Sequence, residues 1–203
     1  MNIISIAGTF SAAAYCIYFI LFVSIHFKNT EYKITKHALS DYDIGSTHKL
    51  FQYYNLSGAI AGLSLAAAFY FSDNNIFHST VPVLFAVMII CRTGLSIFKT
   101  AIEGQKLTFI SLLHYMFAAG SFAAAFIIIR QVNAQFLERN LQAGIRIIIL
   151  SYNYLLTIIL TAVCITIFKP LRYFFGISER LYILTAATWF FLISILFAVN
   201  GSL

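Results

Sequence analysis

Apolar and polar residues alternate along the chain in long blocks. Six blocks consist mainly of Ile, Leu, Val, Phe and Ala, and most charged residues lie between them. A helix of about 20 apolar residues spans a hydrocarbon core of roughly 30 Å, and a helix satisfies its own backbone groups in lipid. The alternating pattern of a membrane β-barrel is absent. The sequence therefore predicts an all-α, six-transmembrane-helix bundle with short loops and spans at about 3–27, 53–71, 80–98, 107–129, 145–168 and 181–199.

The composition agrees with a chain that lies mostly inside a bilayer. Of the 203 residues, 61% are hydrophobic and only 10% are charged, whereas a soluble domain carries about 25% charged residues. So few charges cannot cover a water-exposed surface. Because one helical bundle accounts for the whole chain, we expect a single transmembrane domain over residues 1–203.

The positive charges are distributed unequally between the two sides of the predicted bundle. The net charge is +6, which in a soluble protein would suggest a nucleic-acid partner. Here Lys and Arg fall mainly in the connections after the first, third and fifth spans, and this bias marks cytoplasmic loops. We expect no nucleic-acid partner. We predict a multi-pass protein of a bacterial inner membrane, with loops 28–52, 99–106 and 169–180 in the cytoplasm and both termini outside.

Two sequence features bear on helix packing. Gly58 and Gly62 form a GxxxG pair in the second span, where small residues let helices approach closely. The pair predicts a packing face within the bundle, or alternatively a homo-oligomer interface. The segment 130–144 has apolar residues at helical spacing among charged ones, which predicts a short helix in the membrane interface.

Two ionisable residues lie inside predicted spans near the positively charged side. Arg92 and His114 are each about seven residues from the nearest span end, or roughly 10 Å deep at 1.5 Å per residue. A buried Arg is costly in lipid and cannot lose its proton, so it needs a partner. Three roles remain open for Arg92: an internal ion pair, a side chain that reaches back to the interface, or a site for a ligand anion such as a lipid phosphate or carboxylate. The acidic candidates for the ion pair are Asp41, Asp43, Glu103 and Glu179.

His114 has a structural and a catalytic interpretation. The structural one is a hydrogen-bonded residue between helices. The catalytic one is a membrane hydrolase that acts on a lipid, in which His37, His48, His114 and Asp41 bind zinc and Ser40, Asp41 and His114 carry out the reaction. No local metal-binding motif supports it. A small transporter that uses His114 and an acid is a third hypothesis, although no internal repeat is evident.

Several short motifs resemble one known family. They are Ser-Asp-Tyr at 40–42, a glycine-rich second span, Gly-Leu-Ser-Ile-Phe at 94–98, His114, Glu-Arg-Leu at 179–181 and Trp189. In this order they resemble the DUF998 family of six-span membrane proteins, which is similar in layout to the Frag1/DRAM/Sfk1 proteins. The resemblance implies the six-span architecture. It also implies a group of functional residues made up of Ser40, Asp41, His114, Glu179, Arg180 and Trp189.

We therefore expect a protein that binds or senses a membrane lipid or small amphiphile through a polar pocket on one face, rather than an enzyme. We expect no cofactor, since zinc belongs only to the hydrolase hypothesis. The residues expected to bind the ligand are Arg92, His114, Ser40, Asp41, Glu103, Glu179, Arg180 and Trp189.

Overall fold

The computed structural model describes residues 2–28, 32–72, 80–100, 108–139 and 142–201. Its six long helices are α1 (Ile3–Lys28), α2 (His48–Phe71), α3 (Thr80–Ile97), α4 (Phe109–Glu138), α5 (Ala143–Thr166) and α6 (Phe175–Asn200). Short 3-10 helices precede α2 and α6: η1 (Leu39–Asp43), η2 (Gly45–Thr47) and η3 (Leu171–Phe174). Each long helix is long and apolar enough to cross a membrane. The predicted all-α, six-span fold is confirmed.

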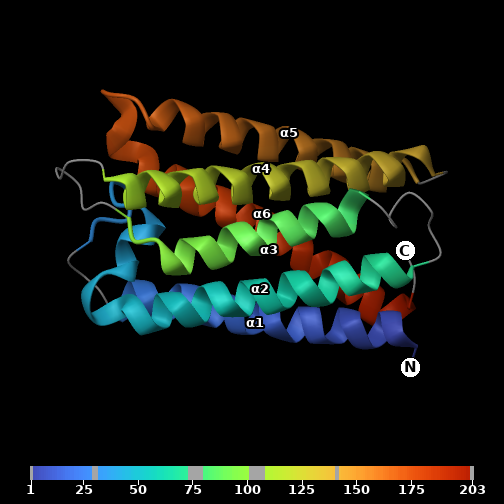
Figure 1. Cartoon of the computed structure of the whole chain (residues 1–203). Coiled ribbons are helices and arrows are strands. Elements are labelled where there is room, and N and C mark those ends of the chain that lie inside the picture. The colour runs from blue at the N-terminus through green and yellow to red at the C-terminus, as the bar shows by residue number, and fades with distance from the viewer. Residues whose placement is uncertain (1, 29–31, 73–79, 101–107, 140–141, 202–203) are drawn as a thin grey trace.

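The helices run side by side, and the two termini lie at the same end of the bundle (Figure 1). The segment before α2 and the η3 turn lie at the opposite end, which we call the polar end (Figure 1). The predicted span limits agree with the helices except at two starts and one end. The second and sixth helices begin five to six residues earlier than predicted, and α4 continues to Glu138.

The prediction of a separate interfacial helix at 130–144 is wrong. Residues 130–138 continue α4, and Val132 and Asn133 within them are buried. The segment between Ile129 and Glu138 has no Gly or Pro to break the helix. Its apolar spacing therefore reflects the inner face of a longer transmembrane helix.

The helices pack as a closed series of neighbours. Helix α1 packs against α2 and α6, α2 against α3, α3 against α4, and α5 against α6, with a smaller contact between α4 and α5. Large rings join these elements in the interior. Phe85 of α3, for example, lies 5.8 Å from Phe69 of α2 and 5.4 Å from Phe190 of α6 between ring centroids. The core is therefore shared by helices distant in sequence.

Two groups of buried hydrogen bonds also connect the helices. The Ser11 hydroxyl of α1 lies 2.9 Å from the Ala61 carbonyl of α2 and 2.8 Å from the Ser194 hydroxyl of α6. On the other side, Trp189 Nε1 donates to Asn133 Oδ1 at 3.0 Å, and Asn133 Nδ2 donates to Asn153 Oδ1 at 2.7 Å. Such bonds hold helices together where lipid offers no competing partner. Trp189 thus links α6 to α4 and, through Asn133, to α5.

The close approach of α1 and α6 predicts the effect of a single methyl group. A Cβ at Gly8 would lie 2.6 Å from the Ala198 backbone nitrogen, and backbone atoms cannot move aside, whereas a Cβ at Gly144 meets nothing within 4 Å. Gly8→Ala should therefore destabilise the fold by about 1–3 kcal/mol. Gly144→Ala, the matched control, should leave the stability unchanged or slightly higher. Thermal unfolding in detergent compares the two, and equal melting temperatures would contradict this packing.

Candidate functional site

Arg92 lies deep in the bundle. Its backbone is on α3, five residues before the end of that helix at Ile97. Side chains on a helix lean toward the N-terminus of the helix, so the guanidinium of Arg92 lies farther from the polar end than its backbone does. The guanidinium contacts Tyr18 and lies against Gly58. Each of these is ten residues from the polar end of its helix, which corresponds to about 15 Å. The charge thus lies about 15 Å inside the polar ends of α1 and α2, and the side chain does not extend back to the polar end of the bundle.

Two tyrosines form the immediate surroundings of this charge. Arg92 Nη2 donates to Tyr18 Oη at 2.9 Å, and its Cζ lies 5.1 Å from the Tyr18 ring centroid and 5.9 Å from that of Tyr54. The two rings stack at 4.3 Å, and their hydroxyls are hydrogen-bonded to each other. Aromatic faces attract a cation, more strongly when water is excluded. Within the described part of the chain, no carboxylate forms an ion pair with Arg92.

Gly58 provides the space that the guanidinium occupies. A Cβ at position 58 would run into Arg92 and would lie 3.1 Å from the Tyr18 ring. One turn further on, a Cβ at Gly62 would lie 3.3 Å from the flexible end of Met88. Both glycines of the GxxxG pair therefore face α3 of the same chain, and this pair serves packing inside the bundle.

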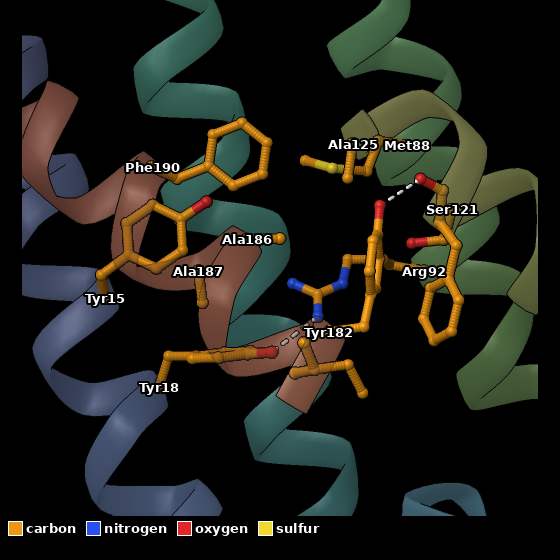
Figure 2. Close-up of a pocket in the computed structure, with 12 residues that line it drawn as sticks. Tyr15, Tyr18, Met88, Arg92, Ser121, Ala125, Tyr182, Ala186, Ala187 and Phe190 are labelled. Carbon is orange, nitrogen blue, oxygen red and sulfur yellow. Dashed lines mark hydrogen bonds between the residues drawn. The ribbon is translucent and has the colours of Figure 1, made fainter. Parts of the chain in front are cut away.

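The guanidinium faces a cavity between α1, α3, α4 and α6 (Figure 2). The enclosed space has a volume of about 30 Å³ and continues into an open side. The polar residues that line it are Arg92, Tyr15, Tyr18, Tyr182 and Ser121. The other walls are largely apolar and include Met88, Phe122, Ala125, Ala186 and Phe190. A polar group set in an apolar cavity is the usual construction of a ligand site.

The hydroxyls around the cavity are not equally engaged. Tyr182 Oη donates to the Phe122 carbonyl at 2.7 Å, so its proton is used. Tyr15 Oη is buried and has no hydrogen-bond partner among the described residues. The Tyr15 ring is held by Tyr18 and Phe190, at centroid distances of 6.0 and 6.2 Å, and its hydroxyl is directed into the cavity (Figure 2). Leaving a buried donor unpaired costs about 1–3 kcal/mol.

Arg180, which the sequence predicts to bind a ligand, forms hydrogen bonds between separate segments at the polar end. Its Nε donates to His26 Nε2 at 2.7 Å, and its Nη1 donates to the carbonyls of Ile34 at 3.0 Å and His37 at 2.7 Å. A Cβ at Gly176 would run into the same two carbonyls, so this glycine lets the segment before α2 lie directly on α6. Arg180 thus joins α1, α6 and that segment.

The Ser-Asp motif belongs to the same structural unit. Glu179 Oε2 accepts the Leu39 amide at 2.6 Å, and Asp41 Oδ2 accepts the Ala38 amide at 2.9 Å. Ser40 is half-buried in η1 beside them. The structure brings Ser40, Asp41, Glu179 and Arg180 together, but none of them lines the Arg92 cavity.

The predicted histidines are held apart by separate partners. His114 Nδ1 lies 2.6 Å from the Phe98 carbonyl, and its buried Nε2 has no partner among the described residues. His37 Nδ1 accepts a hydrogen bond from the backbone amide of the residue four positions earlier. His48 Nδ1 lies 2.8 Å from Asp43 Oδ1. Burial raises the pKa of Asp43, an effect that the hydrogen bond from His48 opposes. Across the parts of the chain that are described, no three His, Cys, Asp or Glu side chains are grouped to hold a metal.

Two further expectations concern Glu103 and Trp189. Glu103 lies outside the described residues. Trp189 is buried in the hydrogen-bonded group of α4, α5 and α6 and does not reach the cavity. Of the predicted ligand residues that the structure describes, only Arg92 borders the cavity.

Comparison with known proteins places these features in a family. The sequence model of DUF998, described as a protein of unknown function, matches residues 12–196, which is most of the chain. This chain belongs to the DUF998 family. The matched region contains both the Arg92 cavity and the polar-end contacts, so the resemblance inferred from the motifs is confirmed. No curated protein and no solved structure matches this DUF998 protein.

Sequence reasoning missed the tyrosines of the site. Tyr15 and Tyr18 are three residues apart on α1 and therefore share one face of that helix. Their position in the sequence could have identified them, because tyrosines of the aromatic belt lie near span ends, whereas these two lie well inside a span. A hydroxyl that far from the interface needs a partner within the protein.

The contacts of Arg180 predict that its loss releases the segment before α2. In Arg180→Gln the carbonyls of Ile34 and His37 lose their charged donor, so this segment should separate from α6 while the long helices persist. A lysine-specific protease should then cut membrane-embedded protein at Lys33 and Lys36 at least tenfold faster than it cuts the wild type. Arg172→Gln, an exposed arginine at the same end, is the control. Equal cleavage of both variants would show that Arg180 does not hold the segment.

Proposed function

We propose that this DUF998 protein binds a membrane amphiphile that carries an anionic group, and that Arg92 receives this group in the cavity between α1, α3, α4 and α6. The observation that carries the proposal is the position of one permanent charge. Arg92 lies deep in the bundle, without a carboxylate partner among the described residues, and faces a cavity. Ionisable residues placed so deep in membrane proteins usually belong to functional sites.

The electrostatics of the site favour an anionic ligand over a neutral one. A guanidinium keeps its proton, so the unliganded bundle holds a full positive charge in a medium of low dielectric constant. The two tyrosine rings and one hydroxyl balance part of this charge. A ligand anion within hydrogen-bond reach interacts far more strongly there than it would in water.

Steric features support binding as well. Gly58 keeps the guanidinium extended into the cavity, since a side chain at this position would displace it. The apolar walls suit the body of an amphiphile. The described residues offer no comparable observation in favour of the hydrolase or transporter hypotheses.

Replacement of Arg92 separates binding from folding. Arg92→Met should reduce the anionic amphiphile that copurifies with the protein at least tenfold, because the charge that holds it is gone. It should leave the delipidated protein equally stable or more stable by about 1–4 kcal/mol, as often happens when buried charge is replaced by an apolar side chain. Mass spectrometry of extracted lipids and thermal unfolding give the two readouts.

Arg130→Met is the control for the Arg92 variant, because Arg130 is exposed on α4. It should leave the copurified lipids unchanged. An unchanged lipid content in Arg92→Met as well would refute the proposed function. A severe loss of stability in that variant would assign Arg92 a purely structural role.

We further propose that the protein resides in a bacterial inner membrane with loops 28–52, 99–106 and 169–180 in the cytoplasm, because these connections carry most of its positive charge. Alkaline phosphatase, which folds only outside the cytoplasm, should be active when fused to the C-terminus. It should be inactive when fused to a chain truncated within 169–174. The reverse pattern would invert the proposed topology.

A further inference from the structure

We infer that the ligand's anionic group is a carboxylate, and that it binds between the guanidinium of Arg92 and the hydroxyl of Tyr15. This inference rests on the proposed function and names the ligand class: a monocarboxylic acid. Three independent observations support it: the depth of the charge, the Tyr15 hydroxyl that lacks a partner within the described residues, and the largely apolar character of the remaining walls.

Depth favours an anion that can become neutral. The guanidinium lies about 15 Å below the polar end of α1 and α2, so a ligand reaching it through lipid must cross hydrocarbon. A phosphodiester keeps its charge at any physiological pH and stays at the interface. A carboxylic acid can cross as the neutral acid and then bind as the carboxylate, since a nearby cation favours its ionised form. Its proton returns to the aqueous phase.

The donors around the cavity match two acceptor oxygens. Arg92 donates one N–H to the Tyr18 hydroxyl, and its guanidinium carries further N–H groups that can donate to a ligand. Tyr15 adds an O–H that is buried, has no acceptor among the described residues, and is directed into the same cavity (Figure 2). An ionised carboxylate accepts hydrogen bonds at both oxygens and donates none. One carboxylate therefore satisfies both groups.

The rest of the cavity suits the apolar group that adjoins a carboxylate. Met88, Ala125, Ala186 and Phe190 present carbon and sulfur to the space next to Arg92. The enclosed space of about 30 Å³ has room for little more than a carboxylate, so most of the ligand must lie beyond it. The ring of a small aromatic acid, or the chain of a fatty acid, extends through the open side. The shared chemistry is the carboxylate next to an apolar group.

The test measures binding to the delipidated full-length protein in nanodiscs of neutral phosphatidylcholine. The probes are hexadecanoate, benzoate, hexadecanol and phosphatidylglycerol. Hexadecanoate, benzoate or both should bind the wild type, and hexadecanol should not, because it lacks the anion. Binding of hexadecanoate alone would assign the acid to the bilayer, and binding of benzoate alone to a water-soluble pool. Either result supports the inference.

Tyr15→Phe is the deciding variant. It removes a hydroxyl that has no partner among the described residues, so it should fold normally while carboxylate affinity falls about tenfold. Tyr42→Phe is its matched control, because the Tyr42 hydroxyl is also buried, has no partner in the described parts of the chain and lies outside the cavity. That control should leave affinity unchanged. Equal affinity in wild type and Tyr15→Phe would overturn the two-donor geometry.

A second pair of variants tests the same site should Tyr15→Phe fold poorly. Gly58→Ala displaces the guanidinium and should weaken carboxylate binding, whereas Gly144→Ala, whose Cβ meets nothing within 4 Å, should not. Binding of phosphatidylglycerol that depends on Arg92, with no carboxylate binding, would overturn this inference and leave the proposed function intact. Failure of every anionic probe, together with unchanged copurified lipids in Arg92→Met, would refute both.

Discussion

The structure of this DUF998 protein depends on how it holds one guanidinium near the middle of a hydrophobic bundle. Arg92 cannot discard its charge, so the surrounding helices must accommodate it. Tyr18 supplies a hydroxyl and a ring face, Tyr54 supplies a second ring, and Gly58 leaves out a side chain. These three residues come from α1 and α2. The pairing of those two helices is therefore set partly by the need to stabilise a charge on α3.

The polar end performs a different task from the cavity. Arg180 and Glu179 bind backbone groups of the segment between α1 and α2, and Gly176 allows that segment to lie directly on α6. This fixes the relative positions of α1, α2 and α6. Those helices carry Tyr18, Tyr54 and much of the apolar wall of the cavity. The residues at the polar end thus position the site without entering it.

The sequence predicted the architecture and one residue of the cavity, for identifiable physical reasons. Apolar blocks of membrane-spanning length define the helices almost without reference to tertiary contacts. Arg92 was identifiable because a charge inside such a block is rare. The direction of its side chain was not, since that depends on the lean of α3 and on Gly58 of a neighbouring helix. The sequence therefore suggested a shallow site near the Ser-Asp motif, whereas the guanidinium lies deeper.

The tyrosines show what sequence reasoning could not determine. Tyr15, Tyr18 and Tyr182 look alike in the sequence of the apolar spans, yet their hydroxyls differ. That of Tyr15 has no partner among the residues that the structure describes, that of Tyr18 contacts Arg92, and that of Tyr182 donates to a carbonyl. Only the packing of four helices distinguishes them. In the same way His114, Arg180 and Trp189 carried the family motifs but bond to backbone or to neighbouring helices.

The most direct measurement is an experimental density map of the protein extracted in patches of its own membrane. If a ligand occupies the cavity as proposed, the map should show non-protein density there, with one end within hydrogen-bond distance of both Arg92 and Tyr15. A carboxylate side chain of the protein itself seated on the Arg92 guanidinium, with the cavity otherwise closed, would contradict it.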